Sequence, residues 1–337
     1  MANTQAIDHV LHQAAQANDV PGVVAMAATD QGVVYEGAFG RRELGKDPAM
    51  TPDTVVWIAS MTKAITSAAA MQLVERGQLQ LDVPAADVVP ELAQAQVIEG
   101  FDASGIPQLR APRRAITLKH LLTHTAGFSH EMFSADIGQY QTATGTPGIT
   151  TCENAALTTP LLCDPGERWE YGINIDWVGK IVEAVSGQKL GDYLQHNFFA
   201  PLGMHSTSFK LSPSQRARLA SVHRRGPDEA LAVLPFEIPQ EPQFQMGGGG
   251  GCIAPRPTTC ASPGCSCIAA RSPATRYCSP RPCTRWPRTT SATCTAWGAG
   301  IPNGVDHSCL RCCASCMSRV CAASYVPKVL SWSGMGR

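Results

Sequence analysis

Apolar residues recur with two different periods near the start of the chain. Val23–Ala28 and Val33–Phe39 are short apolar runs separated by Thr29-Asp30-Gln31-Gly32, whose Asp and Gly favour a turn. This pattern predicts two strands joined as a hairpin. Residues 3–18 predict an amphipathic helix before the hairpin, because apolar residues recur there at helical spacing, at Ile7, Val10, Leu11, Ala14 and Ala15.

The next strongly apolar segment follows Ser60 and is rich in Ala, Ile, Met and Leu. It contains no Gly or Pro before Gly77, and Thr54–Ile58 leads into it. Such a segment predicts a helix with little polar surface, and a helix that is apolar on most sides lies in a protein core. We therefore expect Ser60 in the first turn of a buried helix.

The middle of the chain contains one short helical pattern and one long stretch of weak pattern. Ile116–Leu122 predicts a short helix with Thr117 as its N-cap, because a threonine hydroxyl can accept a hydrogen bond from the free N–H groups of the first turn. Residues 129–160 show little periodicity, which predicts a loop-rich insertion.

Two later helices complete the predicted elements. Trp177–Val185 predicts a helix that ends at Ser186-Gly187, with glycine in the usual stop position. Tyr193–Phe199 predicts another helix. A hairpin and helices beside a mostly helical insertion indicate an α/β (α+β) fold, in which a sheet is flanked by helices and residues of roughly 80–205 form a helical subdomain.

Length and charge narrow the classes of function. The chain has 337 residues, enough for one large domain or two small ones, and its formal net charge is zero. A neutral chain gives no overall electrostatic reason to expect a nucleic-acid partner. The chain has no run of about 18 apolar residues, and its first residues lack both a basic start and an apolar stretch. We therefore expect a cytoplasmic protein with neither a membrane span nor a signal peptide.

Charge and composition change abruptly after the glycines at 247–251. Residues 1–251 carry 26 of the 27 acidic and 17 of the 27 basic residues, a net charge of −9. Residues 252–337 have a net charge of +9, with Asp306 as their one acid. Twelve of the 14 cysteines and nine of the 25 prolines also lie in this last part. The change predicts a boundary at residue 251.

The first chemical candidate is the Ser-x-x-Lys sequence formed by Ser60 and Lys63. Residues three apart share a helix face, so the lysine ammonium can reach the serine hydroxyl. A serine hydroxyl is a weak nucleophile until a base takes its proton, and a lysine can be that base when burial or another cation lowers its pKa. The start of a helix adds partial positive charge that suits a developing oxyanion. The alternative is a helix-start serine beside a solvated lysine, and the apolar helix weighs against it.

Tyr171 is the second candidate, because it lies between the turn Asp164-Pro165-Gly166 and a predicted helix. A phenol near an ammonium group loses part of its high pKa and can carry a proton to or from a serine. The alternative is an ordinary half-buried tyrosine. His120 and His124 are further bases by type, but the sequence pairs neither with a nucleophile, so we expect structural roles for both.

Four motifs resemble one known superfamily when they are taken together and in order. The superfamily is that of the serine β-lactamase-like enzymes, which contains class C β-lactamases, D-alanyl-D-alanine carboxypeptidases and family VIII carboxylesterases. The motifs are Ser60-x-x-Lys63, Leu121–Gly127 (Leu-Leu-Thr-His-Thr-Ala-Gly), Pro165-Gly166 followed by Tyr171, and Pro201–Met204 (Pro-Leu-Gly-Met).

The resemblance covers about residues 5–251 and implies more than the residues alone establish. It implies a β-lactamase/transpeptidase-like fold with an antiparallel sheet, over a hydrolase domain of residues 1–251. It also implies a nucleophilic Ser60, with Lys63 and Tyr171 as the proton-transfer pair. No metal or organic cofactor is expected.

One position departs from the lactamases of this superfamily. They usually place Asn or Ser two residues after the tyrosine, where this chain has Ile173, and Asn174 comes one position later. The stretch Tyr171–Gly179 is more similar to the esterase branch. We therefore expect a serine carboxylesterase that acts on small acyl esters, with a small-molecule ester or amide as its substrate. The alternatives are β-lactamase or D-alanyl-D-alanine carboxypeptidase activity, or a penicillin-binding or sensor module that turns over poorly.

Three interpretations compete for residues 252–327, which lack helical or strand periodicity. A disulfide-rich tail conflicts with the expected reducing compartment. A zinc site would need paired Cys-x-x-Cys spacing, but Cys312-Cys313-x-x-Cys316 has only His307 near it. The third interpretation is a segment read out of frame, because suitable synonymous codons for residues 252–267 spell an amphipathic helix in the neighbouring frame. We expect this frameshift, with the C-terminal part of the sheet missing or disrupted and the chain as written insoluble or nearly inactive.

The last residues, 328–337, contain a further motif. Leu330–Gly336 resembles the Trp-x-Gly strand of the esterases through Trp332 and Gly334. If the frame returns there, the resemblance implies that the backbone N–H of Met335 joins that of Ser60 in an oxyanion hole. The alternative is a chance match.

Overall fold

A computed structural model of the protein describes residues 4–29 and 32–251. The predicted out-of-frame segment and the predicted strand with Trp332, Gly334 and Met335 lie outside these residues. In the described part the chain forms helices and three separate two-stranded antiparallel hairpins. No helix in this part combines the length and apolar character that crossing a membrane requires.

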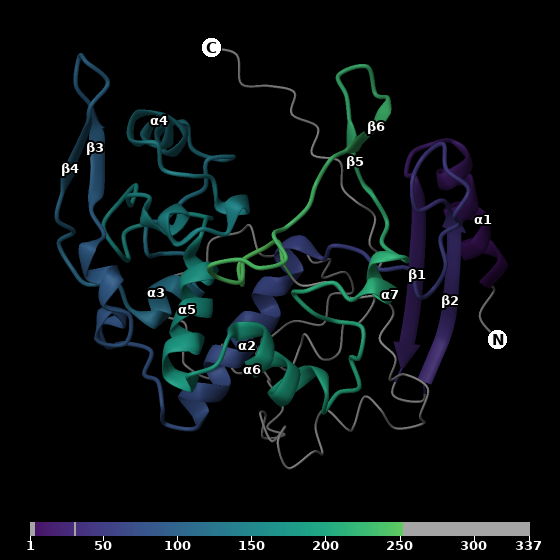
Figure 1. Ribbon diagram of the computed structural model, residues 1–337, viewed down its shortest axis with the longest axis horizontal. Coiled ribbons are helices and arrows are strands. Elements are labelled where there is room, and N and C mark those ends of the chain that lie inside the picture. The colour runs from purple at the N-terminus through teal and green to yellow at the C-terminus, as the bar shows by residue number, and fades with distance from the viewer. Residues whose placement is uncertain (1–3, 30–31, 252–337) are drawn as a thin grey trace, which may run out of the picture.

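The N-terminal helix and hairpin form as the apolar pattern predicts. Helix α1 (Thr4–Gln16) precedes strands β1 (Gly22–Thr29) and β2 (Gly32–Gly40), which pair antiparallel with a bulge between Ala27 and Ala28. Helix α1 lies along this hairpin at one end of the molecule (Figure 1). Within residues 4–29 and 32–251, β1 and β2 pair only with each other.

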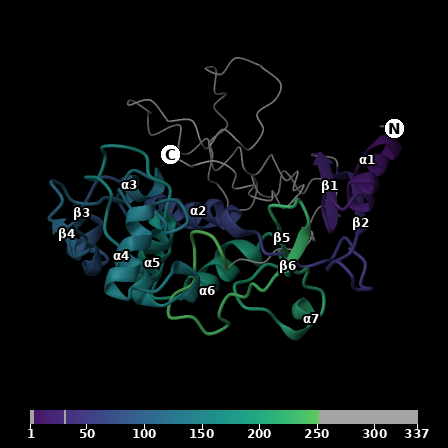
Figure 2. The same cartoon turned by 90° about the horizontal axis from the view of Figure 1, so that it is seen from above.

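Helix α2 (Thr62–Glu75) runs through the centre of the molecule. Six of its 14 residues are buried, which confirms the prediction of a buried helix, and it packs against α5 (Asn174–Ser186). Seen from above, α2 lies between the β1–β2 hairpin and α5 (Figure 2). The sequence predicted Ser60 in the first turn of this helix. It lies instead in the short 3₁₀ turn Ala59–Met61, which precedes α2.

Short helices and one hairpin connect α2 to α5. The hairpin consists of β3 (Val97–Phe101) and β4 (Pro107–Arg110). Helix α3 (Leu118–Leu122) has Thr117 as its N-cap, which confirms the prediction from the sequence. Besides helix α4 (Ala135–Thr144), this region contains the 3₁₀ turns Ala85–Asp87, Pro90–Gln94, Ile149–Thr151 and Asn154–Thr158.

The prediction that residues 129–160 are rich in loops is wrong for ten of them. They form helix α4 (Ala135–Thr144), with Ser134 as its N-cap and Gly145 in the left-handed conformation at its end. Ile137 is the one buried residue of this helix. A helix that buries so little has almost no apolar period, and for this reason the sequence did not indicate it.

The helices after residue 170 are longer than their predicted ranges. Helix α5 starts one turn before the predicted Trp177, and it ends at Gly187, whose φ of 68° confirms the glycine stop. Helix α6 (Leu190–Leu194) starts before the predicted Tyr193 and continues into a π-helical turn at Gln195–Phe199. The elements that follow are α7 (Pro213–Arg216), β5 (Val222–Arg225) and β6 (Leu231–Leu234).

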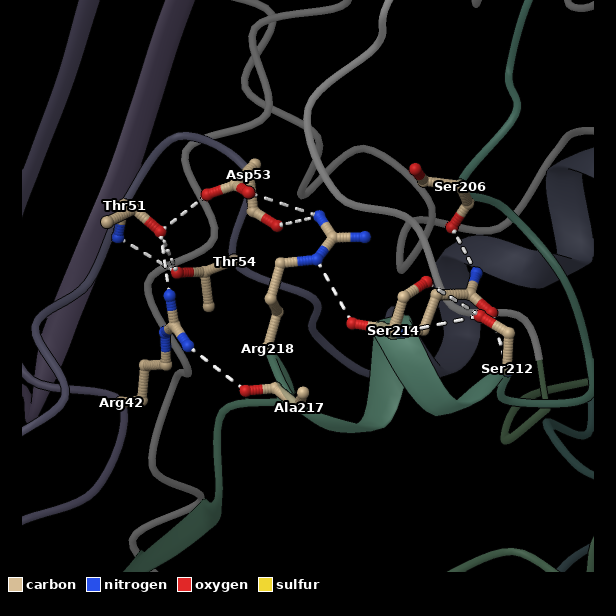
Figure 3. Close-up of polar contacts among 10 residues, drawn as sticks. Arg42, Thr51, Asp53, Thr54, Ser206, Ser212, Ser214, Ala217 and Arg218 are labelled. Carbon is tan, nitrogen blue, oxygen red and sulfur yellow. Dashed lines mark hydrogen bonds and ion pairs between the residues drawn. The ribbon is translucent and has the colours of Figure 1, made fainter.

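The segment that leads to Ser60 is held by residues that follow α7 (Figure 3). Arg218 donates from Nη1 to the Asp53 carbonyl oxygen at 2.7 Å and to Asp53 Oδ2 at 3.3 Å. The Val55 N–H donates to the Arg218 carbonyl and the Ala220 N–H donates to the Val55 carbonyl, both at 2.9 Å. The two backbone bonds form a parallel bridge between Val55 and Leu219, which fixes the chain five residues before Ser60.

Candidate active site

Ser60 is presented on a strained turn at the start of α2. The preceding residue, Ala59, has a left-handed backbone with φ of 43°. This conformation is unfavourable for a residue with a Cβ, and it persists only where the surrounding structure enforces it. Ser60 itself is exposed. The turn therefore holds the hydroxyl where a substrate can reach it.

Lys63 and Tyr171 converge on the Ser60 hydroxyl. Tyr171 Oη lies 2.7 Å from Ser60 Oγ, and Lys63 Nζ donates to Ser60 Oγ at 3.3 Å. Lys63 Nζ also lies 4.6 Å from the centroid of the Tyr171 ring, which is a cation–π contact. The structure thus brings together the three residues that the sequence indicated, although Tyr171 is 111 positions from Ser60.

The loop that carries Tyr171 is fastened to His124. The Glu170 N–H donates to the His124 carbonyl at 2.7 Å, and the His124 ring stacks on the Tyr171 ring with centroids 5.0 Å apart. The buried Asn174 Nδ2 lies 3.1 Å from His124 Nδ1 and 3.1 Å from the Phe128 carbonyl oxygen. Asn174 therefore holds the Tyr171 loop through His124.

The two histidines near the site have rings engaged in packing and capping. Burial, and the charge of Lys63 as a second cause, lower the pKa of His124 to about 3, so its ring is neutral near pH 7. The His120 ring accepts at Nδ1 from the Thr117 N–H at 3.3 Å and completes the cap of α3. The stacking of His124 and the capping by His120 agree with the structural roles that we expected for both residues.

The glycines at 247–251 form one wall of the site, a role that the sequence analysis missed. The Lys63 ammonium donates to the Gly248 carbonyl, and the Gly248 N–H donates to Asp176 Oδ1 at 2.8 Å. A Cβ at Gly248 would lie 2.2 Å from Asp176 Oδ2, so a larger residue does not fit. At Gly249 a Cβ would lie 3.5 Å from Lys63 Nζ and 3.7 Å from Ser60 Oγ. The sequence analysis treated the run of glycines only as a boundary. The same run is also the signal that the backbone here lies close to the side chains of Ser60, Lys63 and Asp176.

Asp176 is the second site residue that the sequence analysis missed. It lies on α5 and is 4% exposed, and this burial raises its pKa to about 6. The charge of Lys63 and the hydrogen bond from Gly248 act in the opposite direction and favour the carboxylate. The available signal was an acid between the apolar residues Ile175 and Trp177, directly before the predicted helix Trp177–Val185.

Large apolar side chains lie exposed around Tyr171 and Ser60. Phe133 and Trp169 are 54% and 45% exposed, and their rings lie 5.6 Å and 6.0 Å from the Tyr171 ring. Met61, the neighbour of Ser60, is 46% exposed. Exposed aromatic side chains beside a nucleophile are typical of a surface that binds an apolar ligand.

The family model described as Beta-lactamase matches residues 7–256, most of the chain. The chain belongs to the beta-lactamase family. This result confirms the resemblance of the four sequence motifs and, with the solved structures below, the β-lactamase/transpeptidase-like fold. The predicted oxyanion strand with Trp332, Gly334 and Met335 lies outside the described residues and stays a prediction for this family member.

Several relatives of this beta-lactamase family member have names that describe acyl chemistry. Acyltransferase mokF of Monascus pilosus is 39% identical over 238 residues, which are 67% of this chain and 57% of mokF. Lovastatin esterase of Penicillium rubens is 35% identical over 251 residues, which are 72% of this chain and 60% of the esterase.

One solved structure illustrates the similarity of fold. The LovD6 mutant of simvastatin synthase (LovD) from Aspergillus terreus is 34% identical, with a TM-score of 0.68 over 76% of this chain and 65% of that one. The chain therefore spans less than two thirds of the length of each of these three relatives.

Proposed function

We propose that this chain is a serine acyl-transfer enzyme, in which an ester acylates Ser60 and the acyl group then passes to water. The approach of Tyr171 Oη to Ser60 Oγ, at 2.7 Å, carries the proposal, because it is within range of direct proton transfer. Lys63 Nζ, at 3.3 Å, is close enough to support the charge that develops. The relatives named an acyltransferase and an esterase support the same chemistry.

Each of the three residues has a distinct role in this proposal. As Ser60 Oγ attacks the ester carbonyl carbon, its proton passes to the Tyr171 oxygen, which acts as a phenolate. The Lys63 ammonium, 4.6 Å from the ring centroid, stabilises that phenolate. The tetrahedral intermediate then collapses, the bond to the leaving alcohol breaks, and Tyr171 returns the proton to the leaving oxygen. Water repeats these steps on the acyl-enzyme and restores Ser60.

The surroundings of Ser60 favour a small ester with an apolar part. Phe133, Trp169 and Met61 offer exposed apolar surface beside the hydroxyl. Two residues after Tyr171, where lactamases have Asn or Ser, this chain has the buried, apolar Ile173. We therefore place carboxylester hydrolysis ahead of β-lactam turnover.

Transfer of the acyl group to an alcohol is the second candidate function. The relative named acyltransferase mokF favours it, and so does the exposed apolar surface, on which an apolar alcohol could bind and compete with water. Both functions share every step up to the acyl-enzyme. They differ only in which oxygen attacks it.

A chromogenic short-chain ester tests the proposal and separates it from a role in binding alone. We expect repeated turnover, and we expect Ser60→Ala to abolish both this turnover and covalent labelling by a fluorophosphonate probe. One-shot labelling of Ser60 without turnover would instead indicate a penicillin-binding or sensor module. Labelling that persists undiminished in Ser60→Ala would contradict the nucleophile assignment. The yield of new ester when an alcohol is added measures the share of acyl transfer.

A further inference from the structure

Asp176 is a buried carboxylate for which the proposed acyl transfer has no use. Its Oδ1 accepts the N–H of Gly248 at 2.8 Å, and the carbonyl of the same glycine accepts from the Lys63 ammonium. Two hydrogen bonds and one glycine therefore connect this carboxylate to the lysine beside Ser60. The connection joins α5 to α2 through the glycine run.

Side chains from two helices, α2 and α5, form hydrogen bonds with one peptide group of the glycine run. The carbonyl of Gly247 accepts from Thr66 Oγ1 on α2 at 2.9 Å, and the N–H of the same peptide group, which belongs to Gly248, donates to Asp176 on α5. The Gly248 carbonyl that holds Lys63 belongs to the next peptide group. The bonds from Thr66 and to Asp176 therefore fix the direction of the Gly248 carbonyl. Glycine is needed at position 248 because no space is left for a Cβ beside Asp176.

Among the charged groups around Asp176, Lys63 has the largest effect on its pKa. Lys63 from α2 and His130 from the segment before α4 both favour the Asp176 carboxylate. Burial acts against it and raises the pKa of Asp176 to about 6, which still leaves the group mainly ionised at neutral pH. Burial, and the charge of Asp176 as a second cause, raise the pKa of the Cys152 thiol to about 11. The Asp176 carboxylate is thus close enough to Lys63 for their charges to interact.

We propose that Asp176 is a positioning residue, which fixes the Gly248 carbonyl against Lys63 and so holds the ammonium beside Ser60 and Tyr171. The inference rests on the proposed acyl transfer at Ser60. A carbonyl acceptor at a fixed position restricts where the Lys63 ammonium can lie, and a misplaced catalytic group slows the reaction. Loss of the contact between Asp176 and Gly248 therefore displaces the ammonium, whereas an uncharged acceptor at position 176 keeps it in place.

Two substitutions separate the charge of Asp176 from its anchoring contact. Asp176→Asn keeps an oxygen that can accept from Gly248 but removes the charge. We expect the rate of Ser60 labelling by a fluorophosphonate to stay close to that of the wild-type chain, because the acceptor for the Gly248 N–H is retained. Asp176→Ala also loses the anchor, and we expect labelling to slow by about 10²-fold, the usual effect of a misplaced catalytic group. All variants are made in the full-length chain.

Glu183→Gln is the matched control, because Glu183 lies on the same helix and accepts a backbone N–H, that of Leu190, at 3.0 Å. It should leave the labelling rate unchanged. A second readout does not depend on Ser60: the rate at which an amine-specific reagent modifies Lys63, followed by mass spectrometry, should rise in Asp176→Ala and stay at the wild-type value in Asp176→Asn. If Ser60 is not labelled at all, acyl transfer is contradicted, while this rate still decides the role of Asp176. A modification rate of Lys63 that is unchanged in Asp176→Ala, or that rises equally in both variants, would overturn the inference.

Discussion

Tyr171 lies closer to the Ser60 hydroxyl than Lys63 does, at 2.7 Å against 3.3 Å. At the scale of single residues this difference is the reason why we propose the phenol for proton transfer and the ammonium for the supporting charge. The stacked His124 ring on one side and the Lys63 ammonium at the ring face restrict where the phenol can move. The Tyr171 hydroxyl is therefore the atom whose removal should affect turnover most specifically.

Tyr171→Phe should lower kcat by about 10²–10⁴-fold, the usual loss when a general base is removed, with little change in KM. Ester hydrolysis under saturating conditions measures the effect. Tyr140→Phe, on α4, is the matched control and should leave kcat unchanged. A decrease of tenfold or less in Tyr171→Phe would leave Lys63 as the base and give Tyr171 a packing role.

The sequence indicated Ser60, Lys63 and Tyr171 because their chemistry requires these residue types within recognisable motifs. Asp176 and Gly248 were not indicated, because their roles arise from a contact between residues 72 positions apart. No local pattern encodes such a contact. The raised pKa of Asp176, to about 6, follows from burial, which likewise exists only in the folded chain.

At the scale of elements, the site depends on the junction between α3, the Tyr171 loop and α5. Asn174 closes this junction from the first residue of α5, where it is fully buried and its Nδ2 lies 3.1 Å from the Glu170 carbonyl and from His124 Nδ1. The backbone bond from Glu170 to His124 lies beside it. A change in this junction should therefore affect stability and the placement of Tyr171 together.

Asn174→Ala should lower the free energy of unfolding by about 1–3 kcal/mol, because buried hydrogen-bonding groups lose their partner. Urea denaturation measures this change, and kcat should fall in the same variant because the Tyr171 loop loses its support. Gln139→Ala, at an exposed position of α4, is the control and should unfold at the wild-type urea concentration. Unchanged stability of Asn174→Ala would mean that the backbone bond alone holds the loop.

The elements that the sequence predicted are those with a clear apolar period or an explicit stop signal. Helix α1, the β1–β2 hairpin and the end of α5 at Gly187 belong to this group. Helix α4 was missed because it buries one residue, and the turn at Ser60 was placed in α2 because a strained Ala59 leaves no mark in the sequence. Strain and sparse packing are properties of the fold, which a periodic pattern does not report.

At the scale of the whole molecule, we expect residues 252–327 to decide whether the chain as written is active. The family match ends at residue 256, close to the change in charge and composition at 251. Within the described part, β1 and β2 have no third strand beside them. An open sheet edge favours aggregation, and loss of one oxyanion donor lowers the rate by about 10²–10³-fold.

We therefore expect the chain as written to be insoluble or nearly inactive, and a version with residues 252–327 read one frame over to be soluble and to hydrolyse esters. Expression of both versions, with solubility and ester hydrolysis measured side by side, checks this prediction. The nucleotide sequence around codon 251 supplies an independent check. A chain as written that is monomeric, folded and as active as the other version would show that the frameshift interpretation is wrong.

The central claim, an acyl-enzyme on Ser60, is tested most directly by mass spectrometry of protein quenched in acid during turnover of a short-chain ester. The account predicts an increase in mass equal to the acyl group, located on the peptide that contains Ser60 and absent from Ser60→Ala. An acyl group located on another residue would contradict it. So would turnover that continues unchanged in Ser60→Ala with no acyl group on the protein.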